Sequence, residues 1–186
     1  GAITGSVVNS TVDHCSSSAS FDISGGADNV SQRFGGIAGS VYSAGEVAAQ
    51  VTNSSNFGIF KSVNTTNSKN GGTAFSIGGV VGYAESASSA LRVMIKGCDN
   101  YGAMNVQASR NAGVVATLNK NATVEGCKNY ADITNTDTKA SNTRVAGIVS
   151  ALNIQTSAIN CVNKGNITFA VAGNTTKGYA AGIAGH

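Results

Sequence analysis

One short block of small and branched apolar residues recurs along the whole chain, and it constrains the fold more than any other feature. The block reads GGIAG at 35–39, GGVVG at 78–82 and AGIVS at 146–150. Its central apolar residue falls at positions 3, 37, 80, 114, 148 and 183, so the intervals are 34, 43, 34, 34 and 35 residues. Recurrence at this period indicates a repeat architecture in which each unit packs on the next one.

A second motif, C-x-N-x-G-x-apolar, alternates with the block. It reads CDNYGAM at 98–104, CKNYADI at 127–133 and CVNKGNI at 161–167, with Ser for Cys at 54–60 and a degraded copy at 15–21. An apolar residue precedes each Cys or Ser by two or three positions: Val12, Val51, Ile95, Val124 and Ile159. Each repeat therefore holds three short apolar runs, and runs of this kind predict strands.

No segment carries an apolar stripe at helical spacing, so the pattern predicts an all-β chain. We predict a parallel β-helix, or β-solenoid, with three short strands per coil and about five coils of roughly 34 residues, equivalent strands lying about 4.8 Å apart. One continuous buried column is then expected from Ile37, Val80, Val114, Ile148 and Ile183.

We expect residues 1–186 to form a single repeat domain. Neither end shows the polar cap that natural solenoids need, so we expect the chain to be excised from a longer protein with neighbouring repeats or domains. The connections between the second motif and the next block vary most in length, the longest being 61–76, and solenoid insertions commonly cluster on one face.

The two motifs together resemble the GLUG-type repeat family of bacterial surface proteins. The resemblance is clearest where the block at 146–150 is followed by INCVNKGNI at 159–167. Such adhesin-like repeats occur in exported proteins of Bacteroidetes, among others. The resemblance implies a β-helical architecture, an extracellular location at the bacterial outer membrane or cell wall, and a role in cell adhesion or as a scaffold.

Composition and charge exclude several functional classes. The formal net charge is only +3, which is too weak to indicate nucleic-acid binding on electrostatic grounds. No apolar run approaches the roughly 18 residues of a membrane helix, so we expect no membrane insertion of this segment. Charged residues make up 11% of the chain, and abundant Ser, Thr and Asn are common in secreted surface proteins.

The sequence offers no catalytic, metal or cofactor site. The four cysteines, Cys15, Cys98, Cys127 and Cys161, share one phase of the repeat and contain no C-x₂-C pair, so we interpret them as a column of small buried thiols without a disulfide. His14 adjoins Cys15, but neighbours in a strand point to opposite faces, which argues against a nucleophile pair. Clustered carboxylates at one phase of adjacent coils are also absent, so we expect no enzyme and no cofactor.

An aromatic column is the first candidate binding feature. The residue between the Asn and Gly of the second motif is Phe57, Tyr101, Tyr130 and then Lys164 in successive repeats. If the Asn side chains face inward and form a hydrogen-bonded ladder, this column faces outward and offers rings to a sugar or a protein. The alternative is that the rings merely cover the turn and shield the core.

A basic column is the second candidate. Arg33, Arg110 and Arg144 each lie four positions before the central apolar residue of a block, and Ser76 takes this place in the intervening repeat. Stacked like charges are unfavourable, so an anionic partner such as an acidic glycan or phosphate is one explanation. A solvated edge is the other.

Three functions remain open from the sequence. The first is a non-catalytic cell-surface binding module, an adhesin that recognises a glycan or an extracellular protein through Phe57, Tyr101, Tyr130, Arg33, Arg110 and Arg144. The second is a structural stalk or spacer without a ligand. The third and weakest is a polysaccharide-active β-helix enzyme, which would require converging carboxylates.

Overall fold

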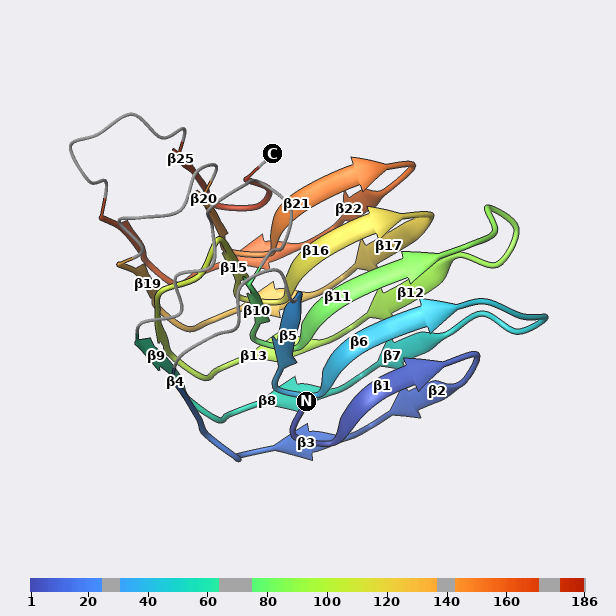
Figure 1. The fold of residues 1–186 in the computed structure, drawn as a ribbon, viewed down its shortest axis with the longest axis horizontal. Helices are drawn as coiled ribbons and strands as arrows, with labels where there is room; N and C mark the ends of the chain where they lie inside the picture. Colours follow the sequence, from blue (N-terminus) through green and yellow to red (C-terminus); the bar gives the residue numbers. More distant parts are fainter. Residues whose placement is uncertain (25–30, 64–74, 137–142, 171–177, 186) are drawn as a thin grey trace.

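The computed structural model describes residues 1–24, 31–63, 75–136, 143–170 and 178–185, and these residues form strands and turns without any helix. The 25 strands make five parallel sheets of five strands, which we name A to E (Figure 1). We expected the connections of variable length to cluster on one face. Large parts of them, including most of 61–76, lie outside the described residues.

Sheet A carries the longest strands, and sheet B follows it in each repeat. Sheet A consists of β1 (Thr4–Val8), β6 (Ala38–Ser43), β11 (Val81–Ser86), β16 (Val115–Lys120) and β21 (Val149–Ile154). Sheet B consists of β2 (Thr11–Asp13), β7 (Gln50–Thr52), β12 (Val93–Lys96), β17 (Ala122–Glu125) and β22 (Ser157–Ile159).

The other three sheets complete each repeat. Sheet C consists of β3 (Ser16–Ser17), β8 (Ser55–Asn56), β13 (Asp99–Asn100), β18 (Lys128–Asn129) and β23 (Val162–Asn163). Sheet D consists of β4 (Phe21–Ser24), β9 (Phe60–Val63), β14 (Met104–Val106), β19 (Ile133–Asn135) and β24 (Ile167–Phe169). Sheet E consists of β5 (Gln32–Gly35), β10 (Phe75–Gly78), β15 (Arg110–Ala112), β20 (Thr143–Ala146) and β25 (Gly178–Ala181).

Every sheet takes each fifth strand of the chain, so the repeats lie on one another in sequence order, as expected of a parallel β-helix. The first repeat is at the bottom of Figure 1 and the last at the top. Five strands recur in the structure where we predicted three. The glycine-rich block contributes two of them, one in sheet E and one in sheet A, because the chain bends between Gly78 and Val81. A further two-residue strand of sheet C lies within each second motif.

The predicted apolar column forms at this bend. Backbone hydrogen bonds run from the Ile37 amide to the Val80 carbonyl at 2.9 Å, from Val80 to Val114 at 3.0 Å, and from Ile148 to Ile183 at 3.2 Å. The first four members of the column are fully buried, whereas Ile183, in the last repeat, is 38% exposed. Identical phases of the repeat therefore lie on identical phases, which confirms the parallel in-register stacking.

Of the apolar residues that precede the Cys or Ser of the second motif, the one named for the last repeat is at a different phase from the others. Val12, Val51, Ile95 and Val124 are aligned along sheet B, but the fifth position is Ala158 and not Ile159. Ala158 packs against the core, and Ile159 is exposed. The reason is the alternation of side chains in a strand, because a shift of one residue moves a side chain to the opposite face.

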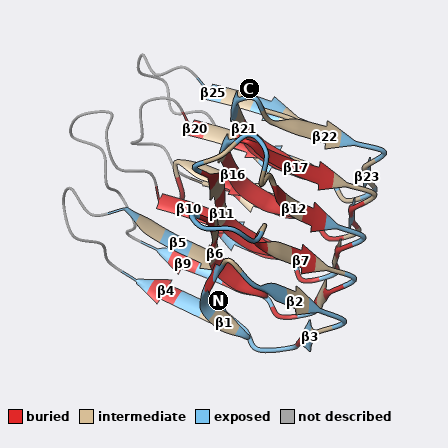
Figure 2. Ribbon diagram, turned by 90° about the vertical axis from the view of Figure 1, so that its right-hand side faces the viewer, coloured by how far each residue is buried: buried red, intermediate tan, exposed pale blue. Residues whose placement is uncertain are grey.

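The interior is divided into two apolar clusters. One lies between sheets A and B and contains branched residues and thiols, such as Ile37, Ile95 and Cys98. The other lies between sheets D and E and contains aromatic residues, such as Phe60 and Phe75. Figure 2 shows that burial is greatest in the three central repeats. The strands of sheet C connect sheet B to sheet D in each repeat, and each lies within a copy of the second motif.

Candidate functional site

The asparagine of the second motif forms the predicted ladder and holds the candidate aromatic column in place. The Nδ2 of Asn56, Asn100 and Asn129 each donates to the Oδ1 of the next asparagine at 2.8 Å, ending at Asn163. Each Nδ2 also donates to the carbonyl two residues later in its own turn, as Asn100 does to Gly102 at 3.1 Å. The first three side chains are fully buried.

The ladder explains why the second residue of the block is glycine. A Cβ on Gly79 would lie 2.4 Å from Cγ of Asn100, and one on Gly113 would lie 2.3 Å from Cγ of Asn129. Gly36 and Gly147 meet Asn56 and Asn163 in the same way. These glycines thus serve close packing across the interior. Glycine-rich segments also occur in phosphate-binding loops, but there a helix follows and directs its backbone amides at the phosphate.

The aromatic column predicted from the sequence is present as a face-to-face stack on the outside of the ladder. The rings of Phe57 and Tyr101 are 4.9 Å apart at an interplanar angle of 4°, and those of Tyr101 and Tyr130 are 4.7 Å apart at 2°. The ammonium group of Lys164 lies 5.1 Å from the centre of the Tyr130 ring and continues the column. Phe57 is 52% exposed and Tyr101 is 43% exposed.

This stacking decides which part of each ring a partner could touch. Both faces of Tyr101 are covered by its neighbours, and Tyr130 is covered by Tyr101 and Lys164. The surface therefore presents ring edges and phenol groups. The Tyr101 hydroxyl donates to Oδ2 of Asp99 at 3.2 Å, and burial together with that carboxylate raises the pKa of Tyr101. Stacking of a sugar ring on an open aromatic face is limited to the outer face of Phe57.

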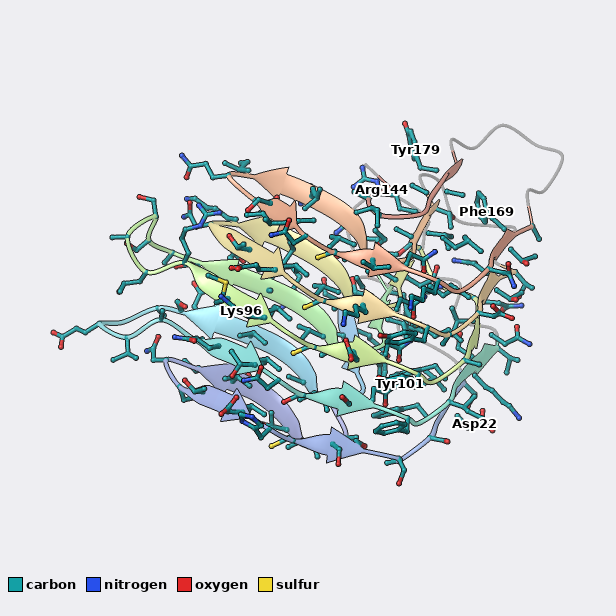
Figure 3. All side chains as sticks on the ribbon, turned by 180° about the vertical axis from the view of Figure 1, so that it is seen from behind. Asp22, Lys96, Tyr101, Arg144, Phe169 and Tyr179 are labelled. Atoms are coloured by element: carbon teal, nitrogen blue, oxygen red, sulfur yellow. The ribbon has the colours of Figure 1, made fainter. Side chains whose placement is uncertain are left out.

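The basic column has the register that the sequence predicts. Arg33 is aligned with Ser76, Ser76 with Arg110, and Arg110 with Arg144 along sheet E. Arg144 is in turn aligned with Tyr179 of β25, and both are labelled in Figure 3. Arg33 is exposed, whereas Arg110 and Arg144 are half-buried.

Sequence reasoning missed that Arg33 has an aromatic partner on sheet A. Its guanidinium carbon lies 3.6 Å from the centre of the Tyr83 ring, and the Tyr83 hydroxyl donates to Oε2 of Glu85 at 2.5 Å. Burial and this carboxylate raise the pKa of Tyr83. In the repeat to which Tyr83 belongs, Ser76 takes the position of sheet E that arginine occupies in other repeats. This small residue leaves room for a larger side chain nearby, and it was the signal in the sequence that could have indicated Tyr83.

The two columns are not brought together. The asparagine side chains point inward against the glycines of the block, so the adjacent rings of Phe57, Tyr101 and Tyr130 point away from it. The arginines are carried by the strand that precedes the same glycines. Among the described residues no contact joins an arginine of sheet E to an aromatic ring of the second motif. Any ligand would therefore meet two separate surfaces.

The cysteine column has a structural role that serine can also fill. The amide of Cys15 donates to Oγ of Ser54 at 3.1 Å, and the amide of Cys98 donates to Sγ of Cys127 at 3.3 Å. The four thiols are free. Contact with Cys98 and burial raise the pKa of Cys127, and burial raises that of Cys161, so neither is an activated nucleophile.

His14 is a turn residue, not a strand residue as the sequence suggested. It has a φ of 50° and shares its phase with Asn53, Gly97, Gly126 and Asn160, all of which have positive φ. Asn and Gly are favoured in this left-handed region, and His tolerates it better than most residues. Its Nδ1 lies 2.7 Å from Oδ2 of Asp13, so the ring is directed to this carboxylate.

Three further observations bear on function. Within the described residues, no group of three or more His, Cys, Asp or Glu side chains is arranged to hold a metal ion. The same part of the chain contains no helix of the length and apolarity needed to cross a membrane. Comparison of the chain with protein-family models, curated proteins and solved structures finds no match.

Proposed function

We propose that the chain is a non-catalytic binding module of a bacterial cell-surface protein, related to GLUG-type adhesin repeats and built as a β-solenoid with one coil per repeat. It binds an extracellular protein through the strip formed by Phe57, Ile59, Tyr101 and Tyr130, which we call the aromatic strip. Neighbouring repeats or domains of the same protein would present it outside the cell.

The exposure of the aromatic strip is the observation that carries this proposal. Phe57, Ile59 and Tyr101 are 52%, 43% and 43% exposed, and they come from adjacent positions of two consecutive repeats. Contiguous apolar surface of this kind marks interaction sites on soluble proteins. Tyrosine is favoured there because it combines a large apolar ring with a hydrogen-bonding group.

The choice of a protein over a neutral glycan follows from the stacking. Sugar rings prefer open aromatic faces, and both faces of Tyr101 are already occupied. Ring edges, the phenol groups and the nearby Ile59 offer instead a narrow, mixed surface suited to side chains of a protein. The same coverage favours the second candidate, a stalk without a ligand, in which the stack only shields the turn.

A binding comparison separates the two candidates. The protein would be screened against purified extracellular-matrix proteins and a glycan array, beside the double variant Phe57→Ser/Tyr101→Ser. Serine is chosen because Ser18 occupies the same phase in the first repeat. Tyr42→Ser, on sheet A, is the matched control for loss of an aromatic side chain.

The proposal expects one or more matrix proteins to bind and the double variant to bind at least about tenfold more weakly, while Tyr42→Ser binds as the parent does. Circular dichroism would verify that both variants keep the β fold. If nothing binds, or if the double variant binds as well as the parent, the stalk is the better description.

A further inference from the structure

Arg110 and Arg144 form a second surface whose chemistry differs from that of the aromatic strip. They are aligned on β15 and β20, so their Cα atoms are about 4.8 Å apart, the spacing of neighbouring strands. Side chains at aligned positions project from the same face of a parallel sheet. Two guanidinium groups therefore leave the same face of sheet E side by side, and both are half-buried.

Among the described residues, no ion pair joins either arginine of this pair to an acidic side chain. In the part of the chain that the structure describes, the ion pairs join Asp13 to His14 and Lys96 to Glu125. The Nε of Arg144 is fully buried and makes no hydrogen bond. Burial and the charge of Arg144 lower the pKa of Arg110, although Tyr83 opposes this shift. Two adjacent cations are thus partly removed from water with a donor left unsatisfied.

Other arginines of the protein are satisfied, which makes the pair exceptional. Arg92 donates to the carbonyl oxygens of Ala122 and Gln155 and to the hydroxyl of Thr123. The guanidinium group of Arg33 lies over the ring of Tyr83. An unpaired buried charge is unfavourable unless something compensates it, and a bound anion does so at both arginines at once.

We propose that Arg110 and Arg144 jointly bind one oxyanion group, such as the sulfate, phosphate or carboxylate group of an acidic glycan. A guanidinium presents its donors as a planar fork that matches the oxygens of such a group. One anion between two forks at strand spacing satisfies donors from both side chains and cancels their repulsion. This site is independent of the aromatic strip, so either proposal can fail without the other.

Isothermal titration calorimetry at low salt tests the site with inorganic sulfate, inorganic phosphate, heparin, polygalacturonate and neutral dextran. Heparin and polygalacturonate distinguish sulfate from carboxylate groups on a glycan, and the two inorganic ions show whether the group alone suffices. The test variant is Arg110→Gln/Arg144→Gln. The matched control, Lys61→Gln/Lys128→Gln, removes the same charge from exposed positions on sheets D and C.

The proposal expects one or more of the anionic probes to bind the parent, dextran not to bind, and the arginine variant to lose at least about tenfold in affinity. The lysine control should stay within about threefold of the parent. Arg110→Lys/Arg144→Lys should also lose affinity, because an ammonium group has no fork. Without ligand, the glutamine variant should melt no lower than the parent, since a repulsive pair has been removed.

Two results would overturn the site. One is that no anionic probe binds the parent. The other is that the lysine control loses as much affinity as the arginine variant, which would mean that only net charge matters. The variant Phe57→Ser/Tyr101→Ser should bind the anion normally, and this distinguishes a failure here from a failure of the aromatic strip.

Discussion

Replacing Asn100 by Ala tests whether the buried ladder stabilises the fold. In the structure its Nδ2 donates to Gly102 at 3.1 Å and to Asn129 at 2.8 Å, while its Oδ1 accepts from Asn56 at 2.8 Å and from the Gly102 amide at 3.3 Å. Each such bond contributes about 1 kcal/mol, and a buried group left unpaired adds to the loss. The Asn56 amide keeps its bond to its own turn and is not left unpaired, so we expect the loss of these four bonds to cost about 4 kcal/mol.

Asn163→Ala is the matched comparison, since this asparagine is at the end of the ladder and is half-buried. Water replaces part of its hydrogen bonding, so about 1 kcal/mol is expected. For a chain of this length the melting temperature should fall by about 8–16 °C for Asn100→Ala and by about 2–4 °C for Asn163→Ala. Thermal unfolding followed by circular dichroism measures the melting temperatures, and urea denaturation measures the free energies of unfolding. Equal losses would refute the reasoning, because burial would then not matter.

Three further outcomes are expected. Gly113→Ala should lower the melting temperature strongly, because the added Cβ would lie 2.3 Å from Cγ of Asn129. Gly126→Ala has open space around the added Cβ but a φ of 62°, so it should lower the free energy of unfolding, measured by urea denaturation, by only about 1–2 kcal/mol. Cys127→Ser should unfold at nearly the same urea concentration as the parent, because the serine hydroxyl can accept the same hydrogen bond. Cys127→Val should be less stable, because the Cys98 amide loses its acceptor. Hydrogen bonds from Thr52 and then from His14 lower the pKa of Asp13 to about 2. The contribution of this carboxylate to stability is therefore present above about pH 4 and is lost as the pH falls toward 2. In an acid titration of stability, the variant Asp13→Asn should lack this step.

Much of the fold could be predicted because parallel in-register stacking places equal phases of the repeat in contact. Phase alone was enough to predict the Ile37–Val80–Val114 column, the asparagine ladder and the alignment of Arg110 with Arg144. None of these needed knowledge of the shape of a coil. Residues that are one period apart in the sequence are the residues that contact one another along the stacking direction.

Local geometry within a repeat was harder to predict. We expected three strands where five recur, because the bend between Gly78 and Val81 leaves no gap in the apolar pattern. We also took Ile159 as the apolar residue that precedes the Cys in the last repeat, whereas Ala158, one position earlier, is the residue aligned with Val124. In both places, the backbone conformation decides which side chain faces inward, and residue type alone does not reveal it.

By itself, the sequence determined what lies above and below each residue, since a repeat of about 34 residues stacks each phase on its copy. Only the tertiary structure decided what meets across a coil. The ring of Tyr83 beside Arg33 and the half-buried state of Arg110 and Arg144 depend on how the five sheets are angled. Those angles arise from bends and packing between different phases, which the period does not encode.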